Sequence, residues 1–95
     1  MDLDSIVERL ARYQQRATYG AVGGVLYEPG PVAGRNCGNL LARCPRNPFY
    51  SWVVRADDGL PSGYVREEMD PAVYARRGTV IRSAAVLEQW LRSHR

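Results

Sequence analysis

The sequence predicts one mostly helical domain with a small β wing, a compact winged helix-turn-helix variant spanning residues 1–95. Residues 17–43 hold two short helical segments separated by a Gly/Pro turn. A run of aromatic and β-branched residues, Tyr50–Arg55, follows and leads into a turn signal at Asp57–Gly59. Helical periodicity occupies both ends of the chain, and its 95 residues suffice for one domain with a modest core.

The first helix is predicted over Met1–Tyr13 and should end near Tyr13–Arg16. Its apolar residues recur at helical spacing and two aspartates can cap its amino end: Leu3, Ile6, Val7 and Leu10, with Asp2 or Asp4. Thr18 can cap a second helix over Tyr19–Leu26, with Val22, Val25 and Leu26 as its apolar face. Three glycines, Gly20, Gly23 and Gly24, each weaken this helix by about 1 kcal/mol, so another backbone is expected to pass close by.

A turn at Glu28–Pro31 is predicted to lead into a third helix, with Pro31 at its first position. If that helix starts near Val32, polar and small apolar residues separate onto two sides. One side carries Val32, Arg35, Asn36, Asn39 and Arg43, and the other carries Ala33, Cys37, Leu40 or Leu41, and Cys44. An Arg/Asn face opposite a small apolar face is typical of a recognition helix, and a merely solvated helix face is the alternative.

The rest of the chain alternates short elements with turns. Pro45–Pro48 breaks the third helix, Tyr50–Arg55 is the best strand, and Leu60–Val65 continues the wing as a loop or a returning strand. Asp70 and Pro71 begin a short helix that ends at Gly78, and Thr79–Arg82 is predicted as a brief strand. Ser83 then caps a final helix whose inward residues are Val86, Leu87, Trp90 and Leu91.

The charges are compatible with nucleic-acid binding without requiring it. The net charge is +3, the isoelectric point is near 9.2, and all 13 basic residues are arginine. We attribute part of this arginine usage to codon bias in a GC-rich genome. Every cation is nevertheless a planar fork suited to phosphates and base edges.

Neither cysteine predicts a disulfide, a metal site or a cofactor. Cys37 and Cys44 on one helix would lie about 10 Å apart, too far for a disulfide, and the only histidine is His94. We expect no metal and no cofactor. Neither a signal peptide nor an apolar membrane span is recognisable, so a cytoplasmic protein is expected, nucleoid-associated if the source is bacterial, and a monomer without membrane partners.

Several motifs resemble, in order and approximate spacing, the DNA-binding domain of alkylguanine–DNA alkyltransferases. The resemblance covers about Ile6–Tyr64 and the last helix. It rests on Ala17–Gly20, the Gly-Arg-x-x-Gly of Gly34–Gly38, Asn47–Pro48, Val53–Asp57, Gly63–Tyr64 and the closing Leu87–Leu91.

The resemblance implies a DNA-binding surface that rotates a damaged nucleotide out of the duplex. In that family a tyrosine in the second helix assists the rotation, and an arginine of the recognition helix fills the vacated stack from the minor groove. The matching positions are Tyr19 and Arg35, and the alternatives are a core tyrosine and a solvated arginine. Further DNA contacts are expected from Asn36 and Asn39, with phosphate contacts from Arg43, Arg46 and Arg55.

The reactive motif of that family is missing. A Pro-Cys-His-Arg sequence is replaced here by Phe49-Tyr50-Ser51-Trp52, and no base accompanies Cys44, so an enzyme is not expected. Alkyltransferase-like proteins bind alkylated DNA without repairing it, usually with tryptophan in place of the cysteine. The expected base pocket consists of Tyr50, Ser51, Trp52 and Tyr64, although Trp52 can equally be a core residue. Glu67–Gly78 resembles an insertion where the family has a pocket-closing loop.

The predicted function is therefore a non-enzymatic module that binds double-stranded DNA and senses alkylated or distorted bases, with a DNA repair or DNA-processing protein as partner. One alternative is a regulator, or an accessory subunit of a DNA-processing system, that reads undamaged sequence. Another is a protein-binding module without DNA affinity, which the acidic Glu67, Glu68 and Asp70 would favour.

Overall fold

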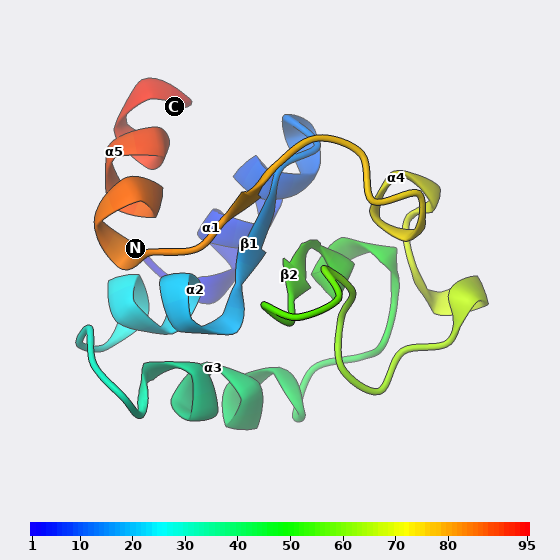
Figure 1. Ribbon diagram of the computed structural model, residues 1–95, viewed down its shortest axis with the longest axis horizontal. Coiled ribbons are helices and arrows are strands. Elements are labelled where there is room, and N and C mark those ends of the chain that lie inside the picture. The colour runs from blue at the N-terminus through cyan, green and yellow to red at the C-terminus, as the bar shows by residue number, and fades with distance from the viewer.

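A three-stranded parallel sheet lies at the centre of the computed structural model, which describes residues 1–95 (Figure 1). Its strands are β1 (Arg16–Thr18), β2 (Val53–Val54) and β3 (Val80–Ile81), in the order β2-β1-β3. Ala17 pairs with Val53 on one side and with Ile81 on the other. About half of the chain is helical: α1 (Leu3–Arg12), α2 (Tyr19–Leu26), α3 (Ala33–Leu41), α4 (Pro71–Tyr74), α5 (Ala84–Ser93) and two 3-10 helices, Pro48–Trp52 and Arg66–Glu68.

Side-chain caps fix the starts of four helices where the sequence predicts them. A carboxylate or hydroxyl oxygen accepts a hydrogen bond from a backbone N–H in the first turn of each helix, which satisfies an otherwise unpaired donor. The caps are Asp2 for α1 (2.9 Å from Ser5 N), Thr18 for α2 (3.1 Å from Ala21 N), Asp70 for α4 (2.9 Å from Ala72 N) and Ser83 for α5 (3.2 Å from Val86 N). These predicted caps are confirmed.

Helix α2 lies between α3 and α5 and packs closely on both. A Cβ added at Gly23 would lie 2.0 Å from the carbonyl oxygen of Ala33, and one added at Gly24 would lie 2.5 Å from the Cβ of Ala84. Both glycines therefore permit close approach of a neighbouring helix, as the sequence predicts.

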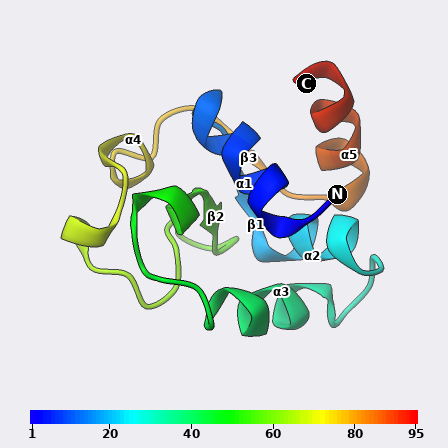
Figure 2. The ribbon, with the colours of Figure 1, turned by 180° about the vertical axis from the view of Figure 1, so that it is seen from behind.

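The core lies between the sheet and its surrounding helices. Figure 2 shows α1 in front of the sheet, and its buried apolar residues belong to the same cluster as Val53 and Val54 of β2. The apolar residues that this helix contributes to the core are those the sequence predicts. The buried cluster includes Ile6, Val7, Leu10, Val22, Cys37, Trp52, Val53, Val54, Val73 and Leu87.

The predicted wing is not confirmed. Within the predicted strand Tyr50–Arg55, the residues before Val53 belong instead to the 3-10 helix Pro48–Trp52. The Asn47 side-chain oxygen Oδ1 accepts a hydrogen bond from the N–H of Phe49 (3.0 Å) and Pro48 sets the first turn, which outweighs the β preference of the aromatic residues. β2 pairs with β1, and residues 60–65 contain no strand.

Three helix boundaries differ from the prediction. α3 begins at Ala33, so Pro31 belongs to the preceding turn, and it ends at Leu41, which leaves Cys44 beyond the helix. α1 ends at Arg12, one residue before the predicted end near Tyr13–Arg16. α4 ends at Tyr74 instead of Gly78, because Arg76 adopts a positive φ of 54° that a helix does not tolerate.

The final helix is α5, with Leu87 and Leu91 buried and Trp90 half-buried. The prediction is wrong for Val86, whose side chain is 54 % exposed. Trp90 stacks on His94 with ring centroids 4.3 Å apart, and Tyr13 meets both rings edge-on. This aromatic cluster joins the carboxyl ends of α1 and α5.

Gly23→Ala is expected to lower the free energy of unfolding by about 1–3 kcal/mol, because its methyl group would overlap the Ala33 backbone and force the two helices apart. Gly38→Ala is the matched control. Its methyl group would meet nothing within 4 Å, so this change should raise stability by about 1 kcal/mol through helix propensity. Urea unfolding of both variants measures the difference, and equal effects would show that α2 and α3 do not need this close contact.

Candidate nucleic-acid interface

A cleft of about 980 Å³ opens between α3 and the segment 55–64. Each of the three parallel strands leads into it, because Tyr19 directly follows β1, Arg55 follows β2 and Arg82 follows β3, and all three line the cleft. The carboxyl ends of parallel strands share one edge of a sheet, which is where open α/β sheets place their ligands. The cleft therefore lies at a favoured binding position of this fold.

Positive charge dominates the lining of the cleft. It contains four arginines and a single acidic residue, Asp57. Two of the arginines, Arg35 of α3 and Arg46, form no hydrogen bond or ion pair with any other residue, so their guanidinium groups are free to bind an anion. The arginines are Arg35, Arg46, Arg55 and Arg82.

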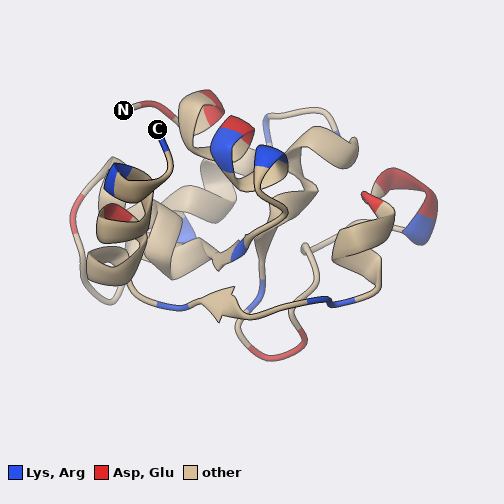
Figure 3. Cartoon of the chain, turned by 90° about the horizontal axis from the view of Figure 1, so that it is seen from above, with Lys and Arg blue, Asp and Glu red and all other residues tan.

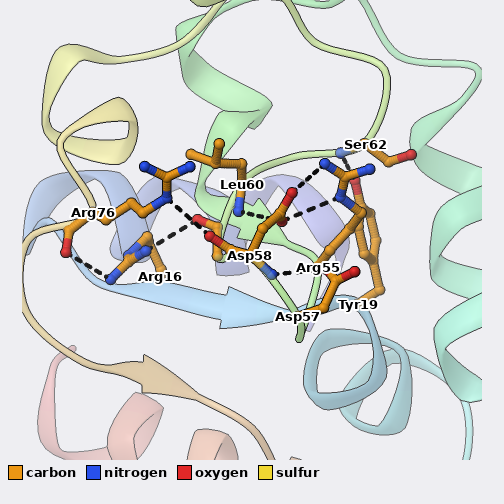
Figure 4. A network of polar contacts seen from close by, with 9 residues as sticks. Arg16, Tyr19, Arg55, Asp57, Asp58, Leu60, Ser62 and Arg76 are labelled. Atoms are coloured by element: carbon orange, nitrogen blue, oxygen red, sulfur yellow. Dashed lines mark hydrogen bonds and ion pairs between the residues drawn. The ribbon is translucent and has the colours of Figure 1, made fainter.

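The other two arginines are anchored in the wall, and Figure 4 shows one of them, Arg55, beside Asp58. Arg55 makes a two-point ion pair with Asp58, in which its Nε lies 3.2 Å from Oδ1. Burial alone would raise the pKa of Asp58, but hydrogen bonds from the N–H of Leu60 and from Arg55 lower it overall. Arg82 Nη1 donates to the carbonyl oxygen of Ala56 (2.7 Å).

Tyr19 connects α2 to the opposite wall of the cleft. Its hydroxyl oxygen accepts a hydrogen bond from the N–H of Ser62 (2.8 Å). Burial raises the pKa of Tyr19, so the phenol keeps its proton at neutral pH. The hydroxyl proton itself has no acceptor within the chain, so it can be donated to a ligand oxygen.

Two further tyrosines border the cleft. The Tyr50 hydroxyl donates to the Asp4 carboxylate (3.0 Å), which raises its pKa to about 12 and leaves its ring, packed edge-on against Phe49, at the cleft. Burial raises the pKa of Tyr64 to about 12. Both side chains therefore present neutral aromatic surface, which can stack on a nucleobase.

Glycines line the helical side of the cleft without a packing reason. A Cβ at Gly38 would meet nothing within 4 Å, and one at Gly34 or Gly20 would make only ordinary contacts of 3.4 Å or more. The first turns of α2 and the middle of α3 therefore expose bare backbone to the cleft. A ligand can approach this backbone more closely than side chains would permit.

Most of the predicted site residues meet in this cleft. The predicted residues that line it are Tyr19, Arg35, Asn39, Arg46, Tyr50, Arg55 and Tyr64. Asn36 and Arg43 are exposed on the surface outside the cleft. Ser51 and Trp52 do not reach the predicted base pocket. Trp52 is 2 % exposed in the core, and the Ser51 hydroxyl donates to the Pro48 carbonyl oxygen (2.7 Å) and accepts from the N–H of Asp70 (3.1 Å).

Arg82 and Ser62 are cleft residues that sequence reasoning missed. Arg82 lies 27 positions after Arg55 in the sequence, and only the parallel pairing of β3 with β1 brings its segment to the same edge. The signal for Arg82 was its place at the end of the predicted brief strand Thr79–Arg82, which becomes informative once that strand is known to be parallel to its neighbours.

Comparison with protein-family models, curated proteins and solved structures finds no match for this chain. No cluster of three or more His, Cys, Asp or Glu side chains has a geometry that could hold a metal ion. None of the helices combines the length and apolar character needed to cross a bilayer.

Tyr64→Phe is expected to reduce the loss of stability at alkaline pH. The half-buried Tyr64 phenol, whose pKa is raised from 10.0 to about 12, stabilises the fold fully below pH 10.0, and this stabilisation is lost as the pH rises through about 12. Urea unfolding measured from pH 9 to pH 11 (about one unit either side of the ordinary phenol pKa) should fall less steeply in this variant than in Tyr27→Phe, which changes an exposed ring. Identical slopes would show that the half-buried Tyr64 phenol titrates no differently in the folded and unfolded chain.

Proposed function

We propose that this chain is a non-enzymatic DNA-binding module, in the manner of the alkyltransferase-like proteins that its motifs resemble. The observation that carries the proposal is the cleft at the carboxyl edge of the sheet, with four arginines against one aspartate. Phosphate contacts supply most of the affinity of proteins for DNA, and arginine forks are well suited to them.

Helix α3 is the element proposed to enter the duplex. Arg35 extends from it without an intramolecular partner, and Gly34 and Gly38 leave its cleft-facing backbone bare. A backbone that can approach closely suits a narrow groove, and a guanidinium can occupy the space left by a rotated base. Both features support an approach from the minor groove, as the resemblance implies.

The ring surfaces of Tyr50 and Tyr64 are proposed to receive an altered or distorted base. Stacking of a base on an aromatic side chain contributes about 1–3 kcal/mol and tolerates changes at the base edge. Tyr19, whose hydroxyl proton is free to be donated, is placed to contact the sugar–phosphate backbone. Trp52 has no part in this proposal because it lies in the core.

The chemistry of the cleft supports binding without alkyl transfer. Neither cysteine lines the cleft, and burial raises the pKa of Cys37 to about 12, which keeps its thiol protonated and unreactive. His94 is stacked on Trp90 at the end of α5 and is absent from the cleft lining. Neither a thiol nor an imidazole, the groups that alkyl transfer in that family requires, is therefore available beside the proposed ligand.

The acidic residues Glu67, Glu68 and Asp70 do not oppose DNA binding at this surface. They lie on the segment that carries the 3-10 helix Arg66–Glu68 and the start of α4, at the end of the molecule away from α5 (Figure 3), and none lines the cleft. Asp70 is occupied as the cap of α4, and the Glu68 carboxylate accepts from the N–H of Val65 (2.9 Å).

Fluorescence anisotropy across a salt series tests the proposal, with matched duplexes that contain or lack one guanine alkylated on its exocyclic oxygen. Preference for the alkylated duplex supports a base-sensing cleft. Equal, salt-sensitive binding supports a general DNA-binding domain and removes the sensing role. Absence of binding to either duplex contradicts the proposal and favours a protein partner.

Arg35→Ala is expected to weaken DNA binding by about 1–3 kcal/mol, because it removes the side chain proposed to enter the groove. The fold should be unchanged, since Arg35 is exposed and bonds to no other residue. Arg77→Ala, which removes an exposed arginine outside the cleft lining, is the matched control and should bind like the wild type. Equal affinities of the two variants would exclude α3 as the recognition element.

Gly38→Ala is expected to separate stability from binding. The added methyl group fills open space at the cleft, so it should raise the melting temperature while increasing the Kd for duplex DNA several-fold. The same change at Gly24 could not be used, because its added methyl group would overlap the Cβ of Ala84. Unchanged affinity in Gly38→Ala would show that DNA does not approach this part of α3.

A further inference from the structure

The side chain of Arg16, in the central strand β1, is buried without an acidic partner. Only 4 % of the residue is exposed, and its guanidinium donates to four backbone carbonyl oxygens. Nη1 donates to Gly59 (3.0 Å), and Nη2 donates to Arg76 (3.1 Å), Gly78 (3.1 Å) and Arg77 (3.4 Å). Arg16 therefore joins two loops that are remote from it in sequence.

This environment is unfavourable for a charge. Burial, together with the nearby charges of Arg76 and Arg82, lowers the pKa of Arg16, and its Nε has no hydrogen-bond partner. An apolar side chain would fill the same space without losing hydration. Only the planar fork of arginine, however, can bond to Gly59 and to residues 76–78 at once.

The loop that Arg16 holds is the tight turn that carries Arg55. Within this turn the N–H of Arg55 donates to Leu60 (2.9 Å) and the N–H of Gly59 donates to Arg55 (3.1 Å). Arg76 supports it from outside through a bond from its Nε to the Asp58 carbonyl oxygen (3.0 Å). Figure 4 shows the resulting network from Arg16 through the turn to Arg55.

Gly59 is shaped to receive the guanidinium. Its φ of +71° favours glycine, and a Cβ there would lie 2.5 Å from Nη1 of Arg16. The turn and the arginine therefore fit each other closely, and a shorter or differently shaped donor at position 16 would leave the turn without its support.

We infer that Arg16 is a positioning residue of the cleft: it fixes the turn 55–60 and thereby the placement of Arg55 for a phosphate of the bound nucleic acid. The inference rests on the proposed function for its ligand. Arg16 does not line the cleft and touches no ligand itself. Its effect is to present Nη1 of Arg55, whose Nε and Nη2 already bond to Asp58, at the edge of the sheet.

Two variants test the inference, Arg16→Lys, which keeps a charge without the fork, and Arg16→Met, which keeps only the apolar stem. Hydrogen exchange in the free protein should become faster at the amides of Gly59, Leu60 and Ser62 and stay unchanged in α3. Leu91→Ala, a core change in α5 outside the cleft, controls for a general loss of stability and should not single out these amides.

Binding to duplex DNA supplies the readout that a merely structural role would not change. Each Arg16 variant should raise the Kd several-fold. The double variant of Arg16 and Arg55→Ala should raise the Kd by less than the product of the two single fold-changes, because both changes act on Arg55. The double variant of Arg16 and Arg35→Ala should raise the Kd by the full product, because the two positions act independently. Independent effects of positions 16 and 55, or unchanged exchange at the turn, would overturn the inference.

Failure of the proposed function would look different. If the wild-type protein binds no duplex, DNA binding is excluded, and hydrogen exchange alone decides whether Arg16 positions the turn. If the wild type binds and the folded Arg16 variants bind equally well, DNA binding stands and the positioning role of Arg16 is wrong.

Discussion

The close contact between α2 and α3 at Gly23 is the constraint on which the shape of the cleft depends. Because no side chain separates Gly23 from the Ala33 backbone, α3 lies flush against α2 and its opposite side is left for the cleft. The other wall of the cleft is held by hydrogen bonds instead, from the N–H of Ser62 to the Tyr19 hydroxyl and from Arg16 to the carbonyl oxygen of Gly59. One wall is thus fixed by apolar packing and the other by buried polar contacts.

These two kinds of support differ in what they tolerate. A helix packed through glycine resists any added volume, but it needs no specific donor or acceptor. A loop held by a single buried guanidinium depends on the full set of carbonyl contacts, because each unsatisfied group in the interior is costly. The cleft therefore combines a wall sensitive to shape with a wall sensitive to hydrogen bonding.

The helices and the places of β2 and β3 could be predicted from the sequence, whereas β1 and the parallel pairing of the three strands could not. Thr18 and Ser83 cap the starts of α2 and α5, and this capping depends only on residues nearby in the sequence. The glycines within α2 likewise indicate locally that another helix packs close to it. β1 has only three residues and opens with an arginine, so no periodicity reveals it. The predicted wing failed because the Asn47 cap and Pro48 favour a 3-10 turn over an aromatic strand. Most of the other polar cleft residues lie in segments that the motifs already marked, whereas the place of Arg82 in the cleft depends on the pairing of β3 with β1.

The order of the sheet also has a consequence for how the chain folds. β1 pairs only with strands that lie far along the sequence, through Ala17 with Val53 and Ala17 with Ile81, and no two strands form a local hairpin. Closing these long loops costs entropy before any pairing is gained, so the sheet has no local nucleus from which to grow. We expect the helices to form early and the sheet late, with the last strand completing the structure only when nearly the whole polypeptide is available.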